Sequence, residues 1–377
     1  MKILMIGGTG TISYDATKYF LAQNHDVYLL NRGNRNNLSD KRLNYIIGNA
    51  NDAKSLESAL DGKEFDVILD FILYNVNQMK ERLAIYNNKC KQFIFISSAT
   101  AYKPTDEIIT EKTELGNDNW EYSRTKKECE IYLRENSSKY SFYYTIVRPY
   151  ITYDNRRIPF PVITKIRYYS LINRIESDKP IIMCGDGNNK LTLTHTRDFA
   201  VALEGLLLNE KAFNEDFHIT GDCVVTWNDI LAIIEKILNK KAIVINIPVE
   251  KLAVYFPSER DELLYDKSLN HVFDNKKIVE QQNIFFYYPQ FKTTYTVESG
   301  LRDTINNLKN SEDLSKIDSV WDYSVNTIIE KYEKETKSSY VHKADIWSKC
   351  MYLLYQKSKC TFLKKVFNRL RYYRGKI

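Results

Sequence analysis

The chain has 377 residues, 44% of them hydrophobic and 27% charged, which suffices for one large or two modest globular domains and excludes general disorder. The formal charge of +6 originates in residues 357–377, which contain eight Lys or Arg and no Asp or Glu, whereas the rest of the chain carries 46 basic and 48 acidic side chains. Because the rest of the chain has no excess of basic residues, its charge does not favour nucleic-acid binding, and we expect no nucleic-acid partner.

The six cysteines are widely spaced and form no CxxC pair, and the first residues read as a strand and not as a signal peptide. No stretch approaches the roughly 18 uninterrupted apolar residues of a membrane-spanning helix. The five histidines show no ligand spacing, so we expect no metal site. These features predict a cytoplasmic protein, and a peripheral contact with a membrane stays open.

The first 150 residues alternate short apolar runs with stretches of helical spacing, which is typical of repeated βαβ units. The predicted strands are Lys2–Ile6, Asp26–Leu30, Leu43–Ile47, Val67–Phe71, Phe93–Ser97 and Tyr144–Val147. The predicted helices are Thr11–Gln23, Ala53–Leu60, Asn77–Asn87 and Ser123–Glu135. The strands are apolar and β-branched, as in strands buried on both faces. We therefore predict an α/β fold with a Rossmann-type doubly wound parallel sheet.

Beyond Pro149 the prolines separate shorter, more irregular segments, which predict a smaller lobe over residues 151–309 whose strands could exchange with the first domain. One helix is expected there, at Thr226–Leu238. Residues 310–377 contain no Pro and one Gly, and they predict a helical, basic C-terminal extension with helices Val320–Lys331 and Ala344–Leu354.

The final segment of this extension has apolar residues at three- and four-residue spacing from Leu363 to Tyr373, with basic residues largely between them. Such a basic amphipathic helix suits an anionic membrane surface or an acidic partner. An exposed helix, or one packed within the molecule, is equally compatible with the pattern.

A glycine-rich turn, GGTGTIS at residues 7–13, joins the first predicted strand to the first predicted helix. Glycines at such a turn let the backbone approach a pyrophosphate, and the helix N-terminus offers N–H groups to it. An ordinary tight turn is the alternative, which the position at the start of a βαβ array disfavours. We expect dinucleotide contacts from Gly7, Thr9, Gly10, Thr11 and Ile12.

The end of the second predicted strand distinguishes NAD from NADP in such folds, because an acidic residue there binds the ribose hydroxyls and repels a 2′-phosphate. This chain has Asn31 and Arg32 instead. The repulsion is absent and a guanidinium can donate to a phosphate, so NADP(H) is favoured and NAD stays open.

A Ser-Tyr-Lys constellation follows. Ser98 ends the fifth predicted strand, and Tyr122 and Lys126 are four residues apart at the start of the next helix, on one face. There the ammonium can lower the pKa of the tyrosine, which makes Tyr122 a candidate acid or base, and Ser98 could bind the same substrate oxygen. The order of these residues after the glycine turn makes the pattern specific.

Five segments carry a family resemblance: GGTGTIS (7–13), FIFISSATAY (93–102), YSRTK (122–126), the triplet at 147–149 and LTHTRDFA (193–200). Through them, residues 1–305 resemble the extended short-chain dehydrogenase/reductase family of nucleotide-sugar epimerases, dehydratases and reductases. The resemblance implies that Tyr122 is the catalytic acid/base, Lys126 its ribose-binding partner and Ser98 the third member. The family's acidic adenine contact corresponds to Asn49. Residues 1–150 would bind the cofactor, and residues 151–309 the nucleotide-sugar substrate.

The resemblance implies an NAD(P)-dependent nucleotide-sugar oxidoreductase of the kind used in polysaccharide biosynthesis. The family's dehydratases place an Asp-Glu pair where this chain has Ala99-Thr100, so dehydration is disfavoured. We favour reduction of a 4-keto sugar, with a 4-epimerase using bound NAD as the alternative. A non-catalytic nucleotide- or RNA-binding relative is a further alternative, against which the retained Ser-Tyr-Lys set argues.

The expected substrate contacts are Tyr74, Ser98, Thr100, Tyr122 and Arg157, the last because a diphosphate requires cationic donors. Individually, the basic residues of the second lobe could equally be surface charges. The oligomeric state, including a homodimer, is left open by the sequence.

Overall fold

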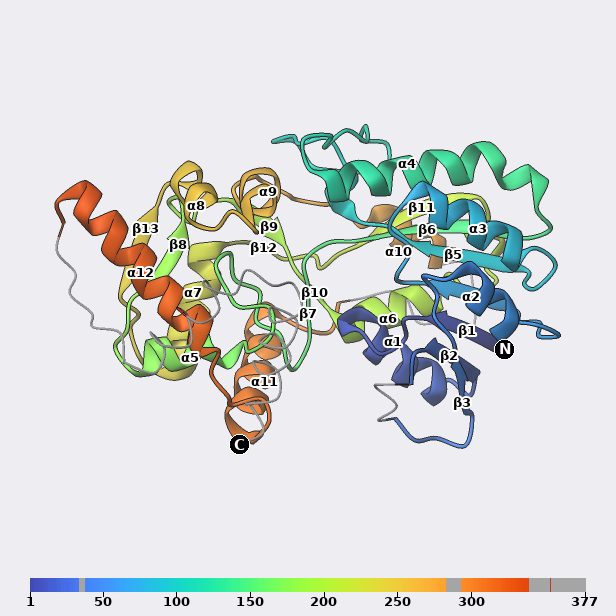
Figure 1. Cartoon of the computed structure of the whole chain (residues 1–377), viewed down its shortest axis with the longest axis horizontal. Helices are drawn as coiled ribbons and strands as arrows, with labels where there is room; N and C mark the ends of the chain where they lie inside the picture. Colours follow the sequence, from blue (N-terminus) through green and yellow to red (C-terminus); the bar gives the residue numbers. More distant parts are fainter. Residues whose placement is uncertain (34–37, 283–292, 339–352, 354–377) are drawn as a thin grey trace. The chain divides into compact units, whose positions relative to one another are not determined.

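The computed structural model describes residues 1–33, 38–282, 293–338 and 353 (Figure 1). The basic segment 357–377 and the predicted helix Ala344–Leu354, apart from Leu353, lie outside the described residues. Within the described ranges, none of the helices combines the length and the apolar character that crossing a membrane requires.

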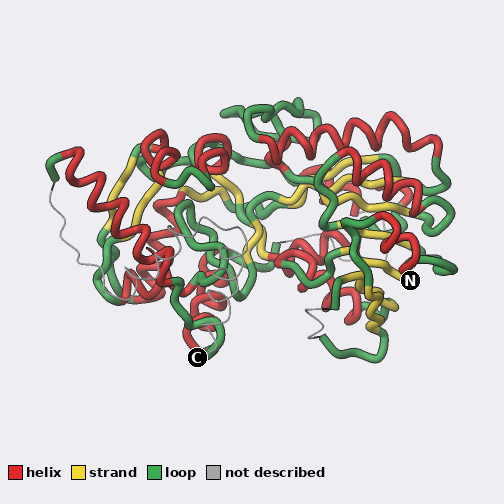
Figure 2. The backbone as a smooth tube through the Cα atoms, in the orientation of Figure 1, coloured by secondary structure: helices red, strands yellow, loops and turns green. Residues whose placement is uncertain are grey.

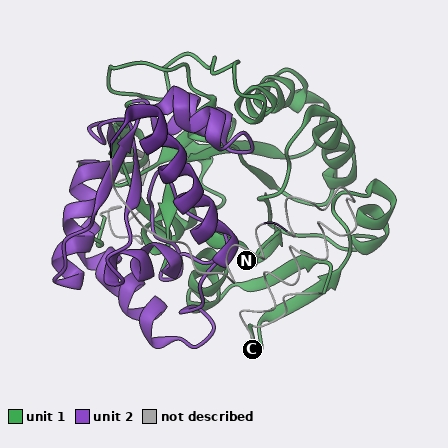
Figure 3. Cartoon of the chain, turned by 60° about the vertical axis from the view of Figure 1, so that its left-hand side comes forward, with its two compact units in different colours: residues 1–154, 191–224, 270–295 green, residues 155–190, 225–269, 296–377 purple. Residues whose placement is uncertain are grey.

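The chain divides into two compact units (Figure 3). Unit 1 comprises residues 1–154, 191–224 and 270–295, and unit 2 comprises residues 155–190, 225–269 and the described residues from 296 onward. The chain leaves unit 1 after Asp154 and returns to it twice. Both returning segments come from the range that the sequence analysis assigned to the second lobe.

Unit 1 is built on a seven-stranded sheet, whose strands are yellow in Figure 2. The strand order is β11-β6-β5-β4-β1-β2-β3, and all neighbouring strands are parallel. Its strands are β1 (Lys2–Ile6), β2 (Asp26–Asn31), β3 (Leu43–Ile47), β4 (Val67–Asp70), β5 (Gln92–Ile96), β6 (Tyr143–Pro149) and β11 (Glu215–Ile219). The strand order reverses between β1 and β4, which is where ligands of such sheets bind. The predicted doubly wound fold is confirmed.

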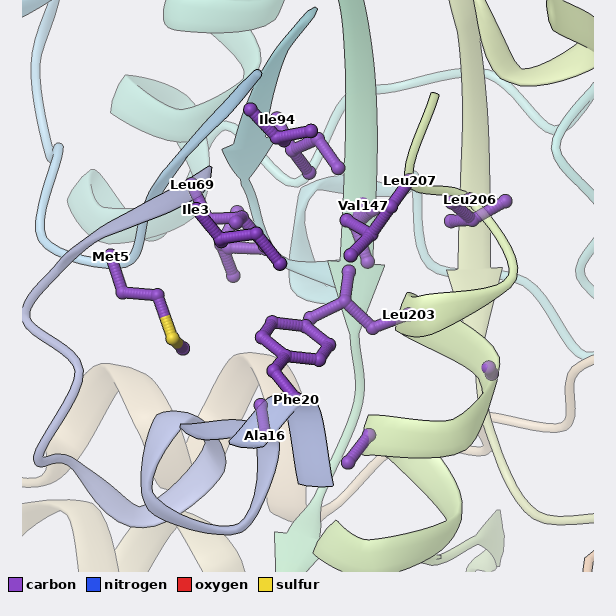
Figure 4. Close-up of a cluster of buried hydrophobic side chains, with 14 of the residues drawn as sticks. Ile3, Met5, Ala16, Phe20, Leu69, Ile94, Val147, Leu203, Leu206 and Leu207 are labelled. Carbon is purple, nitrogen blue, oxygen red and sulfur yellow. The ribbon is translucent and has the colours of Figure 1, made fainter. Parts of the chain in front are cut away.

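Helices cover both faces of this sheet. They are α1 (Thr11–Ala22), α2 (Ala53–Ala59), α3 (Val76–Tyr86), α4 (Glu121–Asn136), α6 (Thr196–Glu204) and α10 (Lys276–Gln282). Ile3 and Met5 of β1 pack with α1 and α6 on one face (Figure 4). Leu4 and Ile6 pack with α2, α3 and α4 on the other face. Each buried apolar side chain of this size contributes about 1.5–3 kcal/mol, which explains the continuous apolar character of the strand.

Strand β11 is absent from the sequence prediction. Among the described strands it pairs with β6 and forms one edge of the sheet, and it contains Glu215, Asp216 and His218 among its five residues. These polar residues interrupt the apolar run by which strands are predicted. They are accommodated because their partners come from distant parts of the chain, as when Arg148 pairs with Asp216.

Unit 2 contains a parallel pair of strands surrounded by helices. The pair is β8 (Ile181–Cys184) with β13 (Val244–Ile247). The helices are α5 (Tyr169–Glu176), α7 (Trp227–Leu238), α8 (Val249–Tyr255), α9 (Arg260–Glu262), α11 (Val297–Asn310) and α12 (Ser319–Thr336). The remaining strands of the chain are short: β7 (Thr152–Tyr153), β9 (Lys190–Thr192), β10 (Thr194–His195) and β12 (Val224–Thr226).

Helix α12 is part of the core of unit 2, although the sequence analysis treated residues 310–377 as an appended segment. Trp321, Val325 and Ile329 of α12 join Ile182 and Ile245 in one buried cluster. A buried ion pair, Arg174 to Asp322 at 2.6 Å, anchors the same helix. The extension was separated in the prediction because the family resemblance ends near residue 305.

Candidate active site

The glycine turn has the conformation that a dinucleotide site requires. Gly7 has φ +85°, in the region that favours glycine, and a Cβ on Gly8 would lie 2.4 Å from the Leu29 side chain. Ser13 stabilises the turn, because its hydroxyl donates to the Gly7 carbonyl at 2.6 Å and accepts from the Gly10 N–H at 2.9 Å. Since α1 has no acidic side chain in its first turn, its positive dipole end is not neutralised.

A cavity of about 310 Å³ opens at the carboxyl ends of β1, β2, β3 and β4. It is lined by Gly7, Thr9, Leu30, Asn31, Arg32, Gly48, Asn49, Ala50, Asn51, Ile72 and Tyr74. The structure thus brings together five of the residues predicted to bind the cofactor: Gly7, Thr9, Asn31, Arg32 and Asn49. Gly10, Thr11 and Ile12 continue the same turn into α1, next to Thr9 and outside this lining.

The side-chain amide of Asn31 has a donor that a ligand could satisfy. Its Oδ1 accepts from the Gly33 N–H at 2.7 Å, while its Nδ2 is buried and has no partner within the described part of the chain. A buried donor without a partner costs about 1–3 kcal/mol. A ribose hydroxyl or a phosphate oxygen in the cavity would accept from it, so the residues fit a dinucleotide.

A buried ion pair connects two of the loops that line the cavity. Arg82 of α3 donates to Asp70 at 2.5 Å and to the Ala50 carbonyl at 2.9 Å. Asp70, at the end of β4, also accepts from the Ile72 N–H at 3.0 Å. The pair therefore joins the loops after β3 and β4, both of which line the cavity. Sequence reasoning missed this pair, although an acidic residue in an apolar strand was a signal for it.

Ser98 is the second residue after β5 and caps the short 3-10 helix Ala99–Ala101. Its hydroxyl is 2.9 Å from that of Thr100, and both side chains are buried. The two hydroxyls form one hydrogen-bonding pair at a strand end, which suits two residues predicted to contact the same substrate.

Tyr122 and Lys126 lie one turn apart at the start of α4. The Tyr122 side chain is 36% exposed, whereas Lys126 is buried with its Nζ 6.0 Å from the Tyr122 ring. Lys126 Nζ donates to the carbonyls of Leu73 at 2.7 Å and Ile96 at 2.9 Å. It thereby connects α4 to the segments that follow β4 and β5.

Burial lowers the pKa of Lys126 to about 8, because removing the ammonium from water disfavours its charge. The group is still predominantly charged at neutral pH. In general, an ammonium close to a tyrosine can stabilise negative charge on the tyrosine oxygen, which is what an acid/base tyrosine requires.

Arg157 lies in unit 2, apart from the other predicted site residues, all of which belong to unit 1. Its guanidinium is 6.0 Å from the Tyr168 ring. Burial alone would raise the pKa of Glu262, but Lys267, Lys165 and Arg157 lower it to about 2. Lys165 and Lys267 pair with Glu262, and Lys267 also pairs with Asp266 at 2.6 Å.

The family model described as NAD dependent epimerase/dehydratase family matches residues 3–219, more than half of the chain. The chain belongs to the NAD-dependent epimerase/dehydratase family. The matched range contains the glycine turn and the Ser98, Tyr122 and Lys126 set. The resemblance predicted from the motifs is thereby confirmed.

Among curated proteins, the chain is 26% identical over 240 residues to the chloroplast stem-loop binding protein of 41 kDa b of Arabidopsis thaliana, covering 60% of each protein. It is 25% identical over 217 residues to N-acetyl-alpha-D-glucosaminyl-diphospho-ditrans,octacis-undecaprenol 4-epimerase of Escherichia coli O157:H7, covering 54% of this chain and 63% of that enzyme. The chain thus matches less than two thirds of the length of each of these relatives.

Among solved structures, UDP-glucuronic acid 4-epimerase from Bacillus cereus, in complex with UDP-glucuronic acid and NAD, is similar with a TM-score of 0.67. The sequence identity is 19%, and the match covers 82% of this chain and 99% of that one. At this identity, the similarity shows that the two proteins share a fold.

Proposed function

We propose that this protein is an NAD(P)-dependent nucleotide-sugar oxidoreductase that reduces a 4-keto sugar nucleotide. The observation that supports this most directly is the position of Lys126. Its Nζ lies 6.0 Å from the centroid of the Tyr122 ring and is hydrogen-bonded to the segment after β4 and to the end of β5. The loop after β4 also lines the cavity that fits a dinucleotide. Acid/base residues and cofactor cavity therefore belong to one unit.

A bound reduced nicotinamide supplies the hydride that reduces the keto carbon. Tyr122 donates its hydroxyl proton to the carbonyl oxygen, which becomes the hydroxyl of the product, and the Lys126 ammonium stabilises the phenolate left behind. Ser98 and Thr100 orient the carbonyl oxygen through their paired hydroxyls. The phenolate then recovers a proton from solvent.

NADP(H) is the proposed cofactor, because Arg32 and the unpaired Nδ2 of Asn31 line the cavity where the family's NAD enzymes carry an acidic residue. We expect Arg32→Gln to weaken NADPH binding about 10- to 100-fold and NADH binding little, since a charged hydrogen bond contributes about 1.5–3 kcal/mol. Calorimetric titration of both cofactors checks this, with Arg42→Gln, at the start of β3, as the control. Equal affinity of the unsubstituted protein for NADH and NADPH would contradict the assignment.

The proposed substrate contact in unit 2 is the cluster of Arg157, Lys165 and Lys267 around Glu262. Lys267 also pairs with Asp266 at 2.6 Å, so the cluster holds three cations and two carboxylates. Its cationic side chains suit a diphosphate, whose oxygens accept charge-assisted hydrogen bonds. Tyr74, another predicted substrate contact, lines the cofactor cavity instead.

The test of the reaction is direct. Purified protein is incubated with NADPH and a nucleoside-diphosphate 4-keto-6-deoxy sugar, and separately with UDP-sugars without added cofactor. We expect one NADPH to be consumed for each alcohol formed in the first reaction and no product in the second. Epimer formation without NADPH oxidation would replace the reductase proposal by the 4-epimerase alternative, the activity printed in the name of the Escherichia coli relative.

RNA binding is the second candidate, because the Arabidopsis relative is named a stem-loop binding protein. The retained Ser98, Tyr122 and Lys126 argue for catalysis, since RNA binding requires none of this arrangement. Absence of turnover with every keto sugar, together with tight stem-loop binding, would favour this candidate.

A further inference from the structure

Tyr74 lies next to both the cofactor cavity and Lys126. It follows β4 and lines the cofactor cavity, and its ring centroid lies 5.0 Å from Lys126 Nζ. Its backbone is held in place, because its N–H donates to Gln78 Oε1 at 2.8 Å and the adjacent Asn75 caps α3. The residue is 45% exposed, so part of it is accessible to a ligand.

The surroundings of Lys126 explain why this ring matters. Aromatic rings of Tyr74, Phe95 and Tyr122 lie 5.0, 4.9 and 6.0 Å from its Nζ. Two of its three ammonium protons bond to the carbonyls of Leu73 and Ile96. The segment after β4 therefore supplies Lys126 with a carbonyl from Leu73 and a ring from Tyr74. Among the described residues these two carbonyls are its hydrogen-bond acceptors, which leaves the third proton for a ligand.

We propose that Tyr74 is a positioning residue for Lys126. The Tyr74 ring keeps the ammonium charged and oriented and forms part of the cavity wall beside it. The proposal rests on the proposed function in that Lys126 is taken to serve hydride transfer. It assigns the role of Tyr74 to the ring, whereas the substrate contact expected from the sequence would use the hydroxyl.

The charge state of Lys126 depends on all the groups that face it. Burial has the largest effect and lowers its pKa; Asp70 from β4 and Cys129 and Glu130 from α4 raise it, while Arg82 from α3 lowers it. An aromatic face favours the charged form and can raise the pKa of a lysine by up to about 1.5. Leucine at position 74 would keep the burial and remove this stabilisation.

The experiment compares full-length Tyr74→Phe and Tyr74→Leu by a titration of ¹³C-labelled lysine side chains in NMR spectra. Lys126 is assigned by the signal that a Lys126→Met variant lacks. We expect a pKa near 8 in the unsubstituted protein and in Tyr74→Phe, and a value about one unit lower in Tyr74→Leu. The matched control is Tyr132→Leu, which removes a ring 5.3 Å from Lys80 on the surface.

Cofactor affinity is measured on the same variants. We expect NADPH to bind Tyr74→Leu about tenfold more weakly and Tyr74→Phe unchanged. An unshifted Lys126 in a folded Tyr74→Leu protein, or a Tyr74→Phe variant as impaired as Tyr74→Leu, would overturn the proposal.

Neither measurement needs turnover, so failure of the reductase proposal is recognised separately. If no keto sugar is reduced but the Lys126 shift is observed, the positioning role stands without the proposed reaction. If turnover is found, its alkaline limb should move to lower pH in Tyr74→Leu, because the lysine then loses its proton at a lower pH.

Discussion

Tyr122→Phe is expected to lower kcat for keto-sugar reduction by about 10²- to 10⁴-fold, the usual contribution of a positioned general acid. The substitution removes only the hydroxyl, so the ring still packs 5.4 Å from Trp120 and the Lys126 pocket is retained. Affinity for NADPH and for the substrate should change by less than about threefold, because the hydroxyl mainly stabilises the transition state and contributes little to binding of the ground state.

Steady-state kinetics over a range of both substrates checks this expectation, and calorimetry measures cofactor binding. The matched control is Tyr143→Phe, on the exposed start of β6, where the hydroxyl is remote from the cavity. Full activity in Tyr122→Phe would show that another group moves the proton, and the role assigned to Tyr122 would be withdrawn.

Arg148→Met is expected to reduce the free energy of unfolding by about 3–5 kcal/mol, the cost of leaving buried charges unpaired. Arg148 of β6 is buried and donates to Glu130 of α4 at 2.5 Å and to Asp216 of β11 at 2.5 Å. It also donates to the Tyr102 hydroxyl at 2.7 Å, and Glu130 accepts from Ser97 at 2.6 Å. Methionine would leave two carboxylates without their main counter-charge.

Urea unfolding at neutral pH measures this loss, with Arg124→Met as the control. Arg124 lies on the exposed side of α4, with Glu128 4.0 Å away, and such pairs contribute less than about 1 kcal/mol. A loss in Arg148→Met no larger than in the control would contradict the assigned role of the buried network.

The network also predicts a dependence on pH. Burial would raise the pKa of Asp216, but Arg148 and Arg134 hold it below the ordinary value of 3.8. A lowered carboxyl pKa contributes stability above the ordinary value, and this contribution is lost as the pH falls through the lower value of the folded state. In Arg148→Met, the free energy of unfolding should therefore fall less on acidification than in the unsubstituted protein.

Local patterns made much of the fold predictable. The strand at Lys2–Ile6 has its predicted bounds because a run of apolar residues can be buried on both faces only in a central strand. The spacing of Tyr122 and Lys126 was equally readable, since residues four apart share a helix face. Strand β11 was not readable, because Asp216 and its neighbours are compatible with a strand only when Arg148 lies beside them.

The sequence by itself determined the doubly wound sheet, the family, and the identity of the glycine turn and the Ser-Tyr-Lys set, since these depend on periodicity and on residues near one another in the chain. The tertiary structure decided which residues share a cavity, that Asp70 and Arg82 join its loops, and that Tyr74 faces Lys126. These relations arise where separate strands end at one edge of the sheet. No local pattern encodes them, because each depends on packing between residues far apart in the chain.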